Sequence, residues 1–200
     1  MFRGKMRAFV ILALSLMLAA APVVAETTVE QRLADLETVR TGLEEGHYDL
    51  FALVTPDEWQ ASLEAAAEKL RDENLDDRMA CYAIIELVAS LGDAHTQAWF
   101  TGGNAQGDIR ALPLQTGLFA DGLYLLATTE PYAQYLGMEI TAIEGVPMND
   151  VFARLTPLIS YDNETRLQTQ LAGNIADAEA LRYVGILDDA SQAEVTFTDA

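Results

Sequence analysis

The chain of 200 residues contains a single cysteine, Cys81, and two histidines, His47 and His95, far apart in the sequence. One cysteine cannot form an internal disulfide, so the hydrophobic core must hold the fold together. Two separated histidines and a lone thiol also lack the ligand spacing of a transition-metal site. The acidic pairs at residues 76–77 and 188–189 lack the spacing of a calcium loop, and there is no phosphate loop or dinucleotide motif. We therefore expect neither a metal nor a cofactor.

Basic residues are scarce as well. Only 12 lysines and arginines stand against 31 aspartates and glutamates, which gives a formal net charge of −19. A surface of this sign repels nucleic acid and anionic lipid, so we expect neither as a partner. The simplest interpretation of the acidity is solubility, ahead of a specific cationic partner.

The first 25 residues have the layout of a secretory signal peptide. Arg3, Lys5 and Arg7 precede an apolar run over residues 8–21, and small residues follow as far as Ala25. This pattern predicts cleavage after Ala25 and an exported protein, periplasmic or secreted. The run is too short to span a bilayer core of about 30 Å, so we expect no stable membrane anchor after cleavage. Cleavage would change the net charge from −19 to −22, because it removes three basic and no acidic residues.

Hydrophobic spacing predicts helices first and strands later in the mature chain. Capping residues and helical periodicity predict helices that begin after Thr28 and after Thr55, and a third over residues 75–91 that is apolar nearly all round and should be buried. Residue types then predict strands at 96–100, 112–119, 123–129 and 138–143. Short helices are expected at 151–155, 162–171 and 177–184, and a last strand at 193–197.

Residues 87–96 end in Leu-Gly-Asp-Ala-His-Thr. This segment resembles a helix-end motif of the tail-specific (C-terminal processing) serine peptidase family and its tricorn-core relatives, usually written Asp-Gly-His-Thr, with Ala94 replacing the glycine. Residues 137–147 are similar to the strand-turn of a bacterial PDZ-like module. Shorter segments that are also similar to this family lie at 47–51, 112–114, 121–124 and 162–164. Their order along the chain, more than any single motif, carries the resemblance.

The resemblance implies an α+β fold. It divides the chain into a signal peptide at 1–25, a helical subdomain at 26–105, a PDZ-like β-rich unit at 106–157, and a helical connector at 158–200 that ends in a short strand. That strand either pairs with the preceding hairpin, burying Val195 and Phe197, or belongs beside a further domain.

The family's activity is proteolysis of an extended polypeptide by an activated serine, in a catalytic domain C-terminal to the region present here. The mature chain offers no convincing nucleophile of its own. Its one lysine, Lys69, is expected on a solvated helix face, and its serines lie outside glycine-flanked turns (Ser62, Ser90, Ser160 and Ser191). Cys81 is expected to be an inert thiol inside the buried helix. We therefore expect the N-terminal part of a serine peptidase that is inactive alone, with an extended polypeptide or peptide terminus as its partner. The alternative is a stand-alone periplasmic peptide-binding or scaffold module.

The candidate site residues follow from the same resemblance. It implies that His95 is a general base for a serine elsewhere, and Asp93 could orient its imidazole. The alternative is that both residues cap the buried helix, with His47 purely structural. Asp121, Gly122 and Leu123 are candidates for a loop that binds a peptide carboxylate. The alternative there is an ordinary hairpin turn in which glycine supplies a positive φ.

Overall fold

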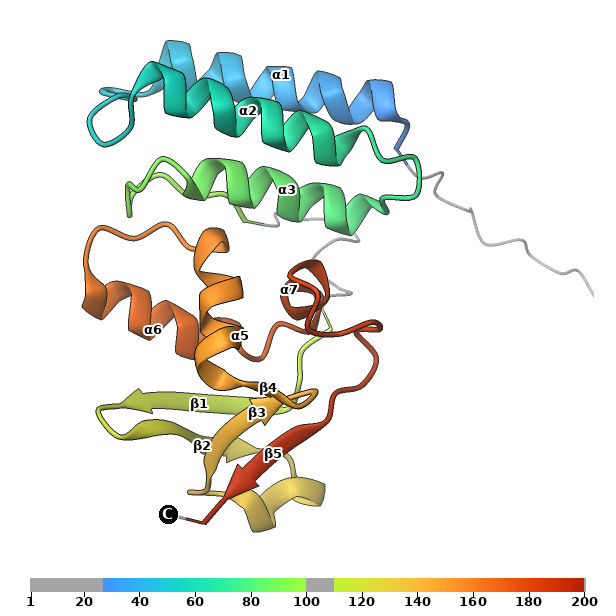
Figure 1. The fold of residues 1–200 in the computed structure, drawn as a ribbon, viewed down its shortest axis with the longest axis vertical. Helices are drawn as coiled ribbons and strands as arrows, with labels where there is room; N and C mark the ends of the chain where they lie inside the picture. Colours follow the sequence, from blue (N-terminus) through green and yellow to red (C-terminus); the bar gives the residue numbers. More distant parts are fainter. Residues whose placement is uncertain (1–26, 100–109, 200) are drawn as a thin grey trace, which may run out of the picture.

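The computed structural model of the protein describes residues 27–99 and 110–199. An N-terminal layer of helices is followed by an antiparallel sheet and C-terminal helices, which confirms the expected α+β class (Figure 1). The signal peptide and the glycine-rich break at 101–104 lie outside the described residues, so cleavage and export stay predictions. None of the described helices is long and apolar enough to cross a membrane.

The helical layer consists of α1 (Val29–Gly46), α2 (Pro56–Leu70) and α3 (Asp77–Ala89). The first two helices begin as expected, each with a capping box. The threonine side chain accepts a hydrogen bond from the N3 backbone N–H, and the N3 side chain accepts one from the backbone N–H of the threonine. Asp76 caps α3 by accepting the N–H of Met79 at 2.9 Å. These caps satisfy backbone donors that a helix start leaves open.

The third helix is buried on two sides, as its apolar sequence predicts. Met79 and Tyr82 belong to the core shared with the sheet, whereas Ala80, Ala83 and Leu87 belong to the core shared with α1 and α2. One helix therefore joins two hydrophobic clusters that would otherwise be separate.

The sheet is built from β1 (Leu114–Phe119), β2 (Gly122–Thr128), β3 (Glu139–Ile143), β4 (Val146–Pro147) and β5 (Val195–Thr198), with the 3-10 helix η1 (Glu130–Tyr135) after β2. The pairs β1–β2, β2–β3, β3–β4 and β3–β5 are all antiparallel. The last strand pairs with β3 and not with the β1–β2 hairpin. This pairing leaves Val195 and Phe197 half-buried, with Phe197 stacked on Tyr135.

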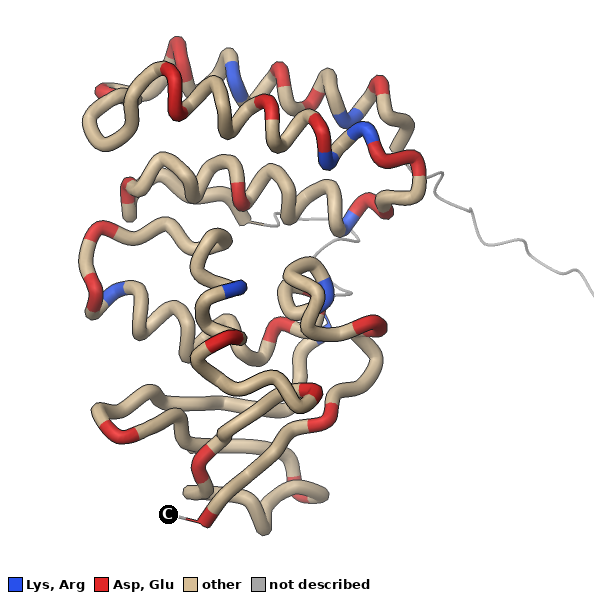
Figure 2. The backbone as a smooth tube through the Cα atoms, viewed as in Figure 1, with Lys and Arg blue, Asp and Glu red and all other residues tan. Residues whose placement is uncertain are grey.

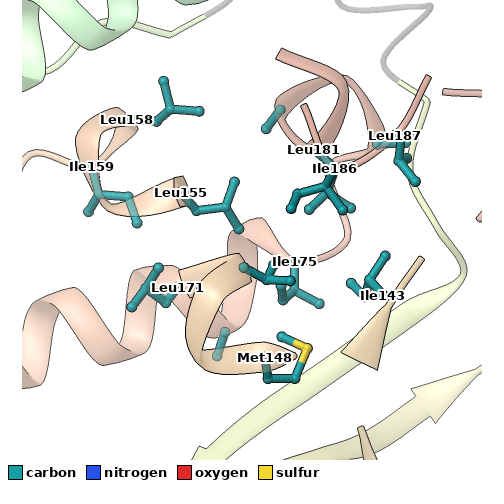
Figure 3. Packing of buried hydrophobic residues seen from close by; sticks show 14 of the residues in the cluster. Ile143, Met148, Leu155, Leu158, Ile159, Leu171, Ile175, Leu181, Ile186 and Leu187 are labelled. Atoms are coloured by element: carbon teal, nitrogen blue, oxygen red, sulfur yellow. The ribbon is translucent and has the colours of Figure 1, made fainter. Parts of the chain in front are cut away.

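The C-terminal helices cover one face of the sheet. They are α5 (Met148–Leu155), η2 (Thr156–Leu158), α6 (Glu164–Asn174) and α7 (Ala178–Tyr183). Figure 3 shows Leu155, Leu171, Ile175 and Leu181 converging with Ile143 of β3. The segment expected as a connector thus shares one hydrophobic core with the sheet.

The strand expected at 96–100 does not form in the part of it that is described, residues 96–99. Side chains, and not a neighbouring strand, donate to the carbonyl group of Thr96 and to that of Ala94, which lies two residues before the segment. Ser160 Oγ donates to the carbonyl of Thr96 at 2.8 Å, and both Gln97 and Arg166 donate to the carbonyl of Ala94. Strand-forming residue types cannot make a strand without a backbone partner.

The two tight turns of the sheet use glycine for different reasons. In the β3–β4 turn, Glu144 and Gly145 have φ of 49° and 71°, the pattern of a type I′ hairpin. At the β1–β2 turn, Gly122 does not have a positive φ, so the reason given for this turn from the sequence is wrong. Its lack of a side chain matters because a Cβ there would lie 2.7 Å from Glu139 Oε1.

Replacing Gly145 with valine should therefore destabilise the protein by about 2 kcal/mol, because a β-branched residue resists a positive φ. Urea unfolding measures this change. The matched control is Gly42→Ala in α1, where an added Cβ meets nothing within 4 Å, and which should stabilise by about 0.5–1 kcal/mol. Equal stability of Gly145→Val and the wild type would contradict the turn assignment.

Candidate functional site

The segment that follows α3 folds around the carboxylate of Asp93. Its Oδ1 accepts the backbone N–H of His95 at 3.0 Å, and its Oδ2 accepts the hydroxyl of Thr96 at 2.6 Å. Gly92, with φ of 69°, turns the chain out of the helix just before it. The carboxylate thus closes the local turn, as the capping alternative expects.

His47 joins the same cluster from the loop between α1 and α2, a connection that sequence reasoning missed. Its Nε2 lies 2.7 Å from Thr96 Oγ1, and its Nδ1 accepts the backbone N–H of Asp49 at 3.2 Å. The Thr96 hydroxyl uses its only hydrogen to donate to Asp93, so its oxygen accepts a hydrogen bond from His47 Nε2–H. The hydrogen bonds therefore fit a neutral imidazole that carries its proton on Nε2.

The imidazole of His95 points away from this cluster. Its ring is 89% exposed, and its Nδ1 lies 3.5 Å from Asp93 Oδ1, which is longer than an ordinary hydrogen bond. It borders an open depression of about 390 Å³ whose other walls come mainly from the start of α6. Among the described residues no hydroxyl is hydrogen-bonded to His95. The short hydrogen bonds of Asp93 go instead to the His95 backbone and the Thr96 hydroxyl.

Ser160, the serine nearest this cluster in the hydrogen-bond network, has a structural role. Its buried hydroxyl donates to the carbonyl of Thr96 at 2.8 Å. Arg166 of α6 donates to the carbonyls of Ala94 at 3.1 Å and Ser160 at 3.4 Å. These bonds fasten the segment after α3 to α6. A hydroxyl tied up in this way is not an activated nucleophile.

The remaining candidate nucleophile, Cys81, is exposed on α3 and not buried, so that expectation is wrong. Desolvation by its neighbours and then the charge of Asp77 raise the pKa of its thiol, which lowers the fraction of reactive thiolate. Lys69 pairs with Glu86, with Nζ 2.5 Å from Oε2 and 3.2 Å from Tyr183 Oη. Within the described residues no group of three or more His, Cys, Asp and Glu side chains could hold a metal ion.

The candidate carboxylate loop forms the turn of the β1–β2 hairpin. Asp121 lies in the turn, Gly122 begins β2 opposite Phe119, and Leu123 is buried in the core. The side chain of Leu123 therefore cannot line a peptide site. The three residues close and follow an ordinary hairpin turn, but without the positive φ that the hairpin alternative assigned to the glycine.

A groove that sequence reasoning missed lies between β1 and α6. It has a volume of about 560 Å³ and none of its lining residues is charged: residues 114–118 of β1 on one side, and Thr165, Gln168, Thr169, Ala172 and Gly173 of α6 on the other. The Thr116 hydroxyl bridges the two walls by donating to the carbonyl of Ala172 at 2.6 Å. Residue types predicted the strand, but no local signal predicted that α6 would lie beside it.

The backbone of β1 is available on this side. Within the described residues β1 pairs only with β2, and the two-residue turn makes Phe119 and Gly122 the closing pair. In an antiparallel ladder hydrogen-bonded pairs alternate with non-bonded ones, so the N–H and C=O groups of Leu118 and Thr116 point away from β2. An extended chain in the groove could bond to them as an added strand.

No protein-family model matches the chain, and no curated protein matches its sequence. The groove and the residues around Asp93 must therefore be interpreted on their own geometry and chemistry.

Replacing Thr96 with valine should destabilise the protein by about 1–2 kcal/mol, because it leaves His47 Nε2 and Asp93 Oδ2 without their partner. In contrast, His95→Ala should change the free energy of unfolding by less than about 0.5 kcal/mol, since its ring is exposed. Chemical denaturation measures both. A larger loss for His95→Ala than for Thr96→Val would contradict the assigned roles.

The cluster should also be sensitive to acid. Hydrogen bonds from the Thr96 hydroxyl and then from the His95 backbone lower the pKa of Asp93 from 3.8 to about 2. A lowered pKa contributes stability above pH 3.8 that is lost as the pH falls through about 2. The difference in unfolding free energy between the wild type and Asp93→Asn should therefore shrink as the pH is lowered across this window. A difference that stays constant in urea titrations would show that the carboxylate has no such linkage.

Proposed function

We propose that this chain is the polypeptide-recognition part of an exported serine peptidase of the tail-specific type, and that alone it binds an extended peptide without cleaving it. The observation that supports this most is the uncharged groove between β1 and α6, bordered by an edge of β1 that no other described strand pairs with. Strand addition supplies backbone hydrogen bonds that do not depend on peptide sequence, while α6 limits which side chains fit.

The uncharged lining of the groove favours some peptide side chains over others. A charged side chain entering it would lose hydration without gaining an opposite charge from the ten lining residues. The strongly acidic chain repels acidic peptides as well. We therefore propose extended segments with small, uncharged side chains as the preferred ligands.

The resemblance supports the peptidase part of the proposal, with His95 as a general base for a serine that another domain would supply. The exposed ring of His95 is compatible with this role, because a partner could reach it. The alternative is a stand-alone periplasmic peptide-binding or scaffold module. It is favoured by the pairing of β5 with β3, which already gives Val195 and Phe197 partners.

Peptide binding is tested with a variant that fills the groove. Gly173 lines the groove and an added Cβ there meets nothing within 4 Å, so Gly173→Leu introduces a side chain at the groove from a position with room for its Cβ. Fluorescence anisotropy of a labelled peptide of Thr, Val and Ala should show binding to the mature wild type. Affinity should fall at least about tenfold, or about 1.4 kcal/mol, in Gly173→Leu.

The control is Gly42→Leu, which makes the same change at an open position of α1. It should bind the peptide as the wild type does, and both variants should be at least as stable as the wild type because leucine favours helix. Unchanged binding by Gly173→Leu would remove the groove from the proposal. A serine-directed fluorophosphonate probe should leave the wild type unlabelled, and labelling that disappears in His95→Ala would show an active enzyme instead.

A further inference from the structure

The loop between α1 and α2, at the end of the helical layer where α3 also ends (Figure 1), presents apolar side chains to solvent. Within six residues Tyr48 is fully exposed, Phe51 is 45% exposed and Leu53 is 64% exposed. Isolated apolar side chains on a surface are ordinary, but a cluster of three large ones marks an interaction site more often than chance. We call these three residues the apolar loop cluster.

The loop holds a fixed shape, which keeps the cluster exposed. Leu50, between the exposed residues, is buried in the core with α1 and α2. His47 bonds to Thr96 at 2.7 Å and accepts the N–H of Asp49 at 3.2 Å, and Ala52 N–H donates to the Asp49 carbonyl at 3.3 Å. The loop cannot fold its apolar side chains inward without breaking these bonds, so the surface is already organised for a partner.

Negative charge surrounds the apolar loop cluster. Figure 2 shows acidic residues where α1 ends, where α2 begins and just after α3. Glu45, Asp49 and Asp57 are exposed around the loop, and Asp93 is linked to it through His47. The nearest cation on α1, Arg40, is already paired with Glu37 and Glu44 at 2.5 Å each. The C-terminal ends of α1 and α3 add partial negative charge, and the N-terminus of α2 adds partial positive charge beside the acidic side chains of Asp57 and Glu58.

We propose that the apolar loop cluster docks a basic amphipathic polypeptide segment, one whose lysines or arginines face the acidic rim while its apolar side chains cover Tyr48, Phe51 and Leu53. Charge complementarity selects this occupant. An anionic lipid surface would be repelled by the rim, and a second copy of the chain would bring the same negative charges together. This site is separate from the β1–α6 groove and does not depend on it.

The probe is a labelled synthetic peptide of about 18 residues in which lysine and leucine repeat with helical spacing. Its binding to the mature protein should weaken as salt is raised, because the rim charges are exposed and screened. The double variant Tyr48→Ser/Leu53→Ser should reduce affinity at least about tenfold, since it removes the two most exposed anchors.

The matched control is Tyr132→Ser/Leu136→Ser, which makes the same changes at exposed residues, 46% and 48% accessible, beside the sheet. It should bind the peptide as the wild type does, and thermal unfolding should show both variants folded. Two further peptides separate the contribution of charge from that of apolar contact. One has glutamate in place of lysine and the other has serine in place of leucine, and each should bind at least about tenfold more weakly. Equal affinity of the two double variants, equal binding of the serine peptide, or no binding at all would each overturn the proposal.

Discussion

The rest of the structure depends on the burial of α3 on two sides. Met79 and Tyr82 pack into the sheet core, and Ala83 and Leu87 pack against α1 and α2. Neither layer alone encloses this helix, so the two layers fold around a shared element. A hydrogen bond also joins α3 to the C-terminal helices: the Tyr82 hydroxyl donates at 2.6 Å to Oδ2 of Asp177, the residue that caps α7. A helix that is apolar nearly all round imposes this arrangement, because any open side would expose apolar surface to water.

Fixing α3 also fixes the segment that leaves it. Asp93 closes the turn, Thr96 joins it to His47 in the first loop, and Arg166 ties the backbone to α6. The candidate histidine His95 therefore stands on a segment held from three sides, while its ring stays in solvent. Such a fixed and exposed group suits contact with a partner better than chemistry in a closed pocket.

Much of the fold could be predicted from the sequence because its signals are local. Threonine caps, the apolar pattern of α3 and the residue types of β1 and β2 each depend on a few neighbouring positions. The candidate site could be predicted only in part. Asp93 and His95 stand in one short motif, but His47 lies 49 residues from Thr96, and no spacing rule connects them. The strand expected from residue 96 does not form over residues 96–99, where the carbonyl group of Thr96 accepts from the Ser160 side chain instead of from a neighbouring strand.

The sequence by itself determined where the first two helices begin, which helix is buried and that no internal cysteine bridge supports the fold, because these follow from residue type and short-range spacing. Only the tertiary structure decided that α6 stands beside the edge of β1, that β5 pairs with β3, and that the first loop exposes Tyr48. Each of these depends on packing and hydrogen bonds between residues that are distant in sequence. Such contacts form only when the whole chain folds, so no local pattern predicts them.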